Sequence, residues 1–171
     1  MIGDIEGVLD ALDSAHVRYL VVGGVAVVLH GYLRATADLD LVLHLERENV
    51  LRAVEALTSL GYRPRAPVDP RAFAEPETRQ RWVRERNLMV FSLWSDAHPG
   101  FEVDIFVEEP FDFEAVYGRS LRVPLERIEA SVISLEDLIA LKRGAGRPLD
   151  LEDIAALEAL RNQREDDHGR S

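Results

Sequence analysis

The sequence predicts an α+β domain, with strands and helices in one chain and a helical C-terminal segment. Residues 88–94 and 101–107 form two apolar runs, and the second has the alternation that is typical of strands. Residues 3–14 and 46–59 instead space their apolar side chains along one helix face. The last third of the chain carries helix-capping residues. Both periodicities occur in one short chain, which favours the α+β class.

Composition limits what this chain can be. The 171 residues have a net charge of −11, 47% hydrophobic residues and no cysteine. That length predicts one domain over residues 1–161, with a core at 17–107, C-terminal helices at 134–161 and a flexible polar tail at 162–171. No apolar run approaches a membrane span, and the acidic N-terminus does not resemble a signal peptide, so we expect a cytoplasmic protein with no membrane partner.

The first elements are a helix and an ambiguous segment. Ile5, Val8, Leu9 and Leu12 share one face of the predicted helix at 3–14. The segment YLVVGGVAVVLHGY that follows fits a β-hairpin, because β-branched residues favour strands and Gly-Gly is a good two-residue turn. Periodicity alone leaves this segment open between a hairpin and a strand followed by a helix.

Asp38 and Asp40 lie one residue apart in the next apolar run. In a strand they would point to the same face, where two carboxylates repel each other. A cation between them removes the repulsion, and Mg²⁺ is the natural candidate because it takes oxygen ligands together with substrate phosphates. The alternative is a pair of exposed acids at the end of a strand.

A third carboxylate belongs to the predicted hairpin at 88–107. The segment SDAHPG between its two runs is rich in turn-forming residues. Glu102 and Asp104 share one face of the second strand, and an acid among Val, Ile and Phe needs a partner. A metal shared with Asp38 and Asp40 would supply it. We favour Asp104 over Glu102, since Glu102 lies nearer the turn and is more easily solvated.

These residues together resemble the polymerase-β-type nucleotidyltransferase superfamily, whose signature is a glycine pair, a spacer, Asp-x-Asp and a later Asp. The closest resemblance is to small bacterial members, which include lincosamide and aminoglycoside nucleotidyltransferases and the nucleotidyltransferase halves of toxin–antitoxin pairs. The resemblance covers residues 17–107 well and the chain to about 160 more loosely. The matching residues are Gly23, Gly24, His30, Gly31, Arg34, Thr36, Asp38, Asp40 and Asp104.

The resemblance implies the nucleotidyltransferase fold: a mixed, twisted, α/β-like sheet flanked by helices. It implies a strand at 17–22, a glycine turn and a helix from about 25 to 32, with Gly23 and Gly24 close to the phosphates. It also implies two Mg²⁺ ions, or Mn²⁺, held by Asp38, Asp40 and Asp104. Asp104 would lie nearest the attacking hydroxyl, and attack on the α-phosphorus would leave a nucleoside monophosphate on the acceptor.

The middle of the chain continues with a helix at 46–59, ended by Gly61, and a proline-rich ordered loop at 64–76. Residues 77–87 then concentrate four arginines around Trp82. They form either a solvated helix face or a positive rim for phosphates or an acidic partner segment. The four arginines are Arg79, Arg81, Arg84 and Arg86.

Two helices are predicted in the last third, one capped by Ser134 and the other by Asp150 with Asp153 three residues on. Between them lies Lys142, the one lysine of the chain, beside Arg147 and Asp150. Related nucleotidyltransferases often show a similar Lys, Arg and Asp cluster, so Lys142 is a candidate phosphate contact. Its alternative is a lysine that only favours a helix C-terminus.

Arg34 and Thr36 precede Asp38 and are candidate nucleotide contacts, with ordinary loop chemistry as the alternative. His30 is expected to cap a helix or pack, not to act in catalysis.

The function predicted is a Mg²⁺-dependent nucleotidyltransferase that moves a nucleoside monophosphate from an NTP, with ATP as the first choice, to a hydroxyl. The acceptor is expected to be a small molecule or a protein, since the acidic charge disfavours RNA. A homodimer could complete an acceptor site. The alternative is a catalytically idle nucleotide-binding or protein-interaction module on the same fold, part of a toxin–antitoxin pair.

Overall fold

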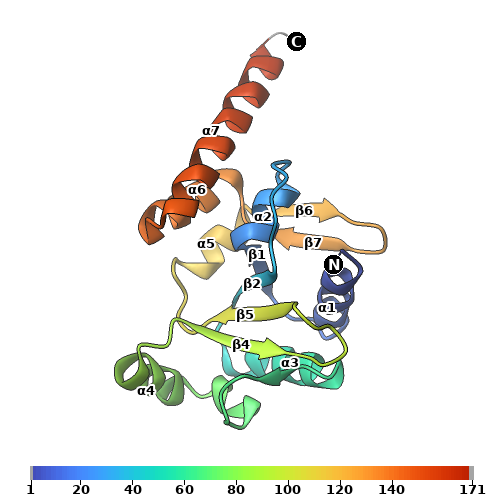
Figure 1. The fold of residues 1–171 in the computed structure, drawn as a ribbon, viewed down its shortest axis with the longest axis vertical. Helices are drawn as coiled ribbons and strands as arrows, with labels where there is room; N and C mark the ends of the chain where they lie inside the picture. Colours follow the sequence, from blue (N-terminus) through green and yellow to red (C-terminus); the bar gives the residue numbers. More distant parts are fainter. Residues whose placement is uncertain (1, 170–171) are drawn as a thin grey trace.

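The computed structural model describes residues 2–169 and contains one seven-stranded sheet with helices packed around it (Figure 1). This confirms the predicted α+β class and the mixed sheet. The elements in chain order are α1 (Ile2–Ser14), β1 (Tyr19–Val22), α2 (Gly23–Leu29), β2 (Asp38–Leu43), α3 (Arg47–Ser59), β3 (Arg63–Pro64), the 3-10 helix η1 (Pro70–Ala74), α4 (Pro76–Arg86), β4 (Val90–Trp94), β5 (Glu102–Phe106), α5 (Phe113–Gly118), β6 (Leu121–Pro124), β7 (Glu129–Val132), α6 (Leu135–Ala145) and α7 (Pro148–Gly169).

The strands are ordered β3-β4-β5-β2-β1-β7-β6. β2 and β5 pair in parallel, while β4 is antiparallel to β5 and β1 is antiparallel to β2. β7 pairs in parallel with β1 and carries β6 as the edge strand. β2 and β5, the strands with the predicted carboxylates, therefore lie side by side near the middle of the sheet.

Along β2 and β5, residues that point into the core alternate with residues that point to the other side of the sheet, where the carboxylates lie. Leu39, Leu41, Val103 and Ile105 are fully buried, and burying such a side chain contributes roughly 1.5–3 kcal/mol. The residues between them, including the carboxylates, are only half-buried. The sheet thus turns its apolar residues to one side and its carboxylates to the other.

The predicted hairpin at 88–107 is present as β4 and β5. The proline-rich loop is also ordered, but it contains the short strand β3 and η1, where Asp69 caps the first turn. Phe73 of η1 stacks on Phe91 of β4, with ring centroids 4.6 Å apart. This contact covers the apolar side of the hairpin.

The glycine segment is a strand followed by a helix, not a hairpin, and the expected boundaries change. α2 begins at Gly23 and ends at Leu29, instead of spanning about 25 to 32. No separate glycine turn precedes it, because Gly23 with φ of 64° makes the change of direction within the first helical residue. Local propensity was ambiguous here, and burial of Val25, Ala26 and Val27 against the core favours the helix.

The C-terminal helices also differ from the prediction. α7 begins at Pro148, so Asp150 lies in its first turn and is not its N-cap. Ser134 does cap α6, accepting a hydrogen bond from the Asp137 N–H, and Gly146 ends that helix in the left-handed region. α7 continues to Gly169 through most of the predicted flexible tail, and it projects beyond the sheet (Figure 1). Residues 170–171 of that tail lie outside the described residues.

Within residues 2–169, none of the helices combines the length and the apolar character needed to cross a membrane.

Candidate functional site

Asp40 and Asp104 lie directly opposite each other on the parallel strands β2 and β5. Neighbouring strands are about 4.8 Å apart, so the two carboxylates share a small volume. Asp38 lies two residues before Asp40 on the same side of β2, opposite Glu102. The structure thus brings together the three carboxylates that the sequence singled out.

Glu102 and Asp104 differ in their partners. Arg65 forms a bidentate ion pair with Glu102, and its Nε lies 2.8 Å from Oε2. This arginine lowers the pKa of Glu102 through its hydrogen bonds and charge. The Oδ1 atom of Asp104, in contrast, is buried without a hydrogen-bond partner. Asp104 is therefore the carboxylate that remains available for a ligand.

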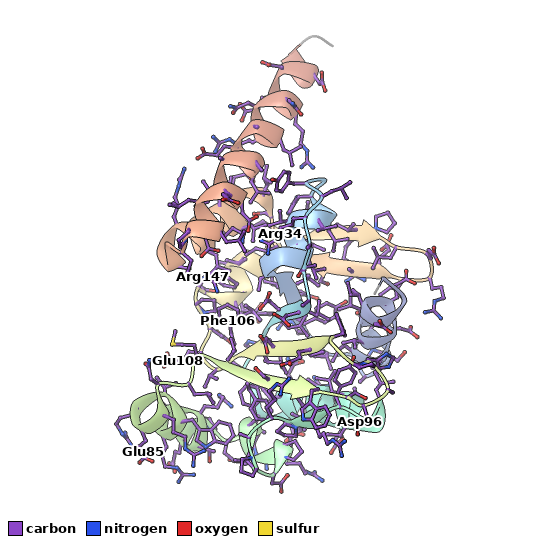
Figure 2. The ribbon with its side chains drawn as sticks, viewed as in Figure 1. Arg34, Glu85, Asp96, Phe106, Glu108 and Arg147 are labelled. Atoms are coloured by element: carbon purple, nitrogen blue, oxygen red, sulfur yellow. The ribbon has the colours of Figure 1, made fainter. Side chains whose placement is uncertain are left out.

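A cavity of about 330 Å³ lies in front of the carboxylates. Five parts of the chain line it: α2, which contributes two glycines, the loop at 30–37, β2, β5 and the junction of α6 and α7. The last four contribute its acidic and basic side chains. Figure 2 shows Arg34 and Arg147, two of its basic residues, near the middle of the molecule. The lining residues are Gly23, Gly24, Arg34, Ala35, Thr36, Ala37, Asp38, Asp40, Asp104, Lys142, Arg147, Leu149 and Asp150.

At both glycines of the cavity wall, neighbouring side chains leave no room for a Cβ atom. A Cβ on Gly23 would lie 2.0 Å from Oδ2 of Asp40. A Cβ on Gly24 would lie 2.8 Å from Oγ1 of Thr36 and 3.3 Å from Nη2 of Arg34. The glycine pair therefore gives room to the side chains of the site, a role that the sequence did not predict.

Asp38 and Asp40 hold protons more tightly than ordinary aspartates do. Burial, followed by the charges of Asp104 and Asp38, raises the pKa of Asp40 to about 7. Burial and the charge of Asp104 also raise the pKa of Asp38. Confining several carboxylates in one place costs free energy that a bound cation would recover.

These residues fit a divalent cation that shares its coordination with substrate. Across residues 2–169, no group of three or more His, Asp or Glu side chains is preformed as a metal cage. Mg²⁺ sites of substrate-assisted type need only one or two carboxylates, with waters and phosphates completing the shell. The buried, unpartnered Oδ1 of Asp104 and the crowded Asp40 have the chemistry such a site requires.

Lys142 is buried at the back of the cavity in an ion-pair network. Its Nζ lies 2.7 Å from Oδ2 of Asp153 and 3.4 Å from Oδ1 of Asp150. Arg34 donates to the same Oδ2 of Asp153, and Nε of Arg147 lies 2.8 Å from Oδ2 of Asp150. Three cations share two carboxylates, which leaves one positive charge beside the catalytic candidates. Lys142 as a phosphate contact stays a prediction.

Two members of this network were not assigned to the site from the sequence. Asp150 was interpreted as a helix cap and as a neighbour of Lys142, and Asp153 as part of the cap, but both are almost fully buried and contact Lys142 of α6. Their i,i+3 spacing, which places both on one helix face, was the available signal. Arg147 was noted only as a neighbour of Lys142, and it lines the cavity.

The loop at 30–37 positions the two remaining candidates. Arg34 reaches α7 through Asp153, and Oγ1 of Thr36 donates to the Asp38 carbonyl at 3.2 Å. His30 is buried with its Nε2 2.8 Å from the Ile133 carbonyl, so it packs, as expected.

The arginine stretch of α4 does not line this cavity. Arg79 is buried, and its guanidinium donates to the carbonyls of Phe73 and Leu45. Burial lowers its pKa. The other three arginines, Arg81, Arg84 and Arg86, are exposed. Trp82 packs on Phe91, so it anchors the helix as the solvated-face interpretation required.

Three solved structures share this fold. A lincosamide antibiotic adenylyltransferase, LnuA, with lincomycin bound, has a TM-score of 0.59 at 18% identity over 89% of this chain and 92% of that chain. The solution structure of the antibiotic-resistance factor ANT(2'')-Ia has a TM-score of 0.59 at 14% identity over 99% and 93%. The crystal structure of ANT(2'')-Ia with adenylyl-2''-tobramycin has a TM-score of 0.58 at 14% identity over 98% of each chain.

No curated protein matches the chain in sequence. One family model, described as a nucleotidyltransferase of unknown function (DUF6036), matches residues 2–165.

Proposed function

The chain belongs to the DUF6036 family of nucleotidyltransferases, and from this premise we propose that it transfers a nucleoside monophosphate from an NTP to an acceptor hydroxyl in a Mg²⁺-dependent reaction. The observation that carries the proposal is the facing pair Asp40 and Asp104, which shares one cavity with Asp38, two glycines and three cations. This is the set of charges that phosphoryl transfer needs, because the protein mainly positions the groups and neutralises charge.

The proposed reaction needs a group that accepts the proton of the hydroxyl, and a leaving group on the α-phosphorus. The acceptor oxygen forms a bond to the α-phosphorus while the bond from that phosphorus to the pyrophosphate oxygen breaks. The proton of the hydroxyl passes to a carboxylate, and Asp104 is the candidate because its Oδ1 has no other partner. Mg²⁺ held by Asp38, Asp40 and Asp104 would neutralise charge on the triphosphate and on pyrophosphate as it leaves.

The basic residues suit the triphosphate. Arg34, Lys142 and Arg147 line the same cavity as the carboxylates. Their two partners, Asp150 and Asp153, hold the three side chains in place and leave one positive charge uncompensated. Gly23, Gly24 and Thr36 would form the wall along which the phosphates lie.

The acceptor proposed is a small molecule or a protein. A net charge of −11 repels nucleic acid, so RNA is a poorer candidate. A second copy of the chain could contribute to an acceptor site. ATP is the first NTP to test.

The decisive experiment combines binding with transfer. The protein is incubated with Mg²⁺, each α-phosphate-labelled NTP and fractionated host lysate, and the label is followed into small-molecule, protein and RNA fractions. We expect transfer by the parent protein and a loss of at least 100-fold in Asp104→Asn, as expected for removal of a positioned base. Asp10→Asn, which changes an exposed carboxylate of α1, is the matched control and should keep full activity.

Nucleotide binding separates the alternatives. Calorimetry with a non-cleavable NTP analogue should show binding that requires Mg²⁺ and is lost in Asp38→Asn and Asp40→Asn. Mg²⁺-dependent binding without transfer to any fraction would favour the idle nucleotide-binding module. Absence of both would contradict the proposal.

A further inference from the structure

A second cavity, of about 540 Å³, lies where β2 and β5 end, next to α4. Asp40 and His44 are four residues apart, which corresponds to roughly 13 Å along a strand, so this cavity is well separated from the catalytic carboxylates. The two cavities have no lining residue in common. We name the second one the α4 cavity. Its lining residues are His44, Leu45, Glu46, Pro76, Arg79, Gln80, Val107, Glu108 and Glu109.

Arg79 lines the α4 cavity as a buried cation without a counter-ion. Only 6% of this residue is exposed. Its guanidinium donates to the neutral carbonyls of Phe73 and Leu45, and in the described part of the chain it forms no ion pair with a carboxylate. Burial lowers the pKa of Arg79, while the charges of Glu109 and Glu75 act against this only from a longer distance. A charge buried in this way costs free energy that a bound anion would recover.

Negative charge without a partner lines the same cavity. Within residues 2–169, Glu108 forms no hydrogen bond or ion pair, and Figure 2 shows it above α4. Oε1 of Glu109 accepts a hydrogen bond from the Leu45 N–H at 2.8 Å, but Oε2 of Glu109 makes none among these residues. Glu46 is different, because both of its oxygens accept N–H groups in the first turn of α3. Glu108 and Glu109 therefore remain available for a positive group.

These charges exclude the simplest ligands. An inorganic anion would pair with Arg79 but would lie near two carboxylates, and a metal ion or a simple amine would lie near the buried guanidinium. The charge of Glu109 acts on Arg79, so the two kinds of partner are close together. A compound that carries a carboxylate and an ammonium group side by side would satisfy both. The rest of its surface would meet the apolar wall of the cavity, which consists of Leu45, Pro76 and Val107.

We propose that the α4 cavity binds a free α-amino acid with an apolar side chain. The carboxylate of this ligand pairs with Arg79, which has further N–H groups to donate, and its ammonium group pairs with Glu109 and Glu108. Its side chain lies against the apolar wall. A peptide carries only one of the two charged groups at each end, so only a free amino acid satisfies both partners. This inference goes beyond the proposed function and does not depend on it.

The probe is L-leucine, and two blocked analogues separate its charges. N-acetyl-L-leucine keeps the carboxylate alone, and L-leucinamide keeps the ammonium group alone. Inorganic phosphate represents a plain anion. Calorimetry measures the affinity of each compound. NMR of protein with isotope-labelled arginine follows the Nε–H signal of Arg79, which is assigned by its absence in Arg79→Lys.

We expect L-leucine to shift the Arg79 signal saturably, without any need for Mg²⁺ or nucleotide. Each blocked analogue should bind at least about tenfold more weakly, because hydrogen bonds between charged groups are among the stronger ones. Glu109→Gln removes the charge but keeps an oxygen for the Leu45 N–H, and it should weaken L-leucine binding to a similar extent. Arg79→Lys keeps the charge but loses the planar fork, and it should also weaken binding.

Two further variants serve as controls. Glu85→Gln removes an exposed carboxylate of α4 that does not line the cavity, and it should leave the affinity for L-leucine unchanged (Figure 2). Asp40→Asn should also keep L-leucine binding, since Asp40 lies in the other cavity. Mg²⁺-dependent binding of a non-cleavable NTP analogue shows that Glu109→Gln and Arg79→Lys are folded.

The inference is overturned if N-acetyl-L-leucine or phosphate shifts the Arg79 signal as strongly as L-leucine, because the cavity would then select an anion. Equal affinity of L-leucine for the parent and for Glu109→Gln would also overturn it. So would the absence of a shift with every apolar L-amino acid at millimolar concentration. Failure of the proposed function is a separate result, namely the absence of Mg²⁺-dependent nucleotide binding in a protein that still binds L-leucine.

Discussion

Lys142 and Asp153 form a buried ion pair between α6 and α7, with Nζ 2.7 Å from Oδ2, and each side chain is almost completely excluded from solvent. The same oxygen of Asp153 accepts a hydrogen bond from Arg34, 119 residues earlier in the chain. One carboxylate therefore links both C-terminal helices to the loop that precedes β2. Its loss would affect both folding and the site.

Replacing Asp153 by Asn should destabilise the fold, because two cations would be left around a neutral side chain. Removing one partner of a buried pair typically costs about 3–5 kcal/mol. We expect a loss of at least about 2 kcal/mol in the free energy of unfolding, measured with urea. Glu152→Gln, one residue away and exposed, should be neutral. Equal stability of the two variants would contradict the network.

Gly23→Ala tests the contact between α2 and β2. The new Cβ would collide with the Asp40 carboxylate at 2.0 Å, in a backbone conformation that side chains rarely adopt. We expect destabilisation by about 1–3 kcal/mol and loss of Mg²⁺-dependent nucleotide binding, followed by thermal unfolding and calorimetry. Gly7→Ala in α1, where a Cβ meets nothing within 4 Å, should instead stabilise by up to about 1 kcal/mol.

Asp40 makes the stability of the metal-free protein depend on pH. Its pKa is about 7 in the fold and close to 3.8 in the unfolded chain, so between these values the native state binds more protons. The contribution of Asp40 to the free energy of unfolding is therefore largest at low pH and falls as the pH rises towards 7. Asp40→Asn removes this dependence.

With a chelator present, the stability of Asp40→Asn relative to the parent should rise by about 2 kcal/mol from pH 5 to pH 8, because one pKa unit corresponds to about 1.4 kcal/mol. Urea unfolding at the two pH values measures it. Added Mg²⁺ should stabilise the parent at pH 8 and not the variant. A difference that is the same at both pH values would show that Asp40 ionises normally.

Arg79 should matter for folding and not for nucleotide binding. Its guanidinium donates to the carbonyls of Phe73 and Leu45, and hydrogen bonds from charged groups contribute about 1.5–3 kcal/mol. Arg79→Met should lower the free energy of unfolding by about 2 kcal/mol and leave the affinity for a Mg²⁺-bound NTP analogue unchanged. Arg81→Met, at an exposed position of the same helix, should change neither. Weaker nucleotide binding in either variant would restore the positive-rim interpretation.

Some features of the site followed from local pattern alone. The i,i+2 spacing of Asp38 and Asp40 requires that they share a face once the segment is a strand, and the alternating run around Asp104 identified the third carboxylate. The hairpin followed from an apolar run, an alternating run and the turn-forming segment between them. The pairing of Glu102 with Arg65, in contrast, which favours Asp104 as the third carboxylate, depends on a position of Arg65 that no local rule predicts.

Other features could not be predicted from residues that are neighbours in the sequence. The segment around Gly23 satisfied both hairpin and helix rules, and only packing of α2 against the core selected the helix. Asp153 satisfied the rule for a capping residue, yet its carboxylate faces Lys142 and Arg34. Both rules describe neighbours within a few residues, and the deciding contacts come from distant parts of the chain.

The sequence by itself determined which residues carry charge, which of them share a face of a strand or helix, and therefore that Asp38, Asp40 and Asp104 could serve one site. Only the tertiary structure decided that Asp40 lies opposite Asp104, that Glu102 is neutralised by Arg65, and that Lys142 and Arg34 meet at Asp153. Periodicity specifies the direction of a side chain relative to its own backbone. Strand register and helix packing specify what that side chain meets, and these depend on the burial of the whole core.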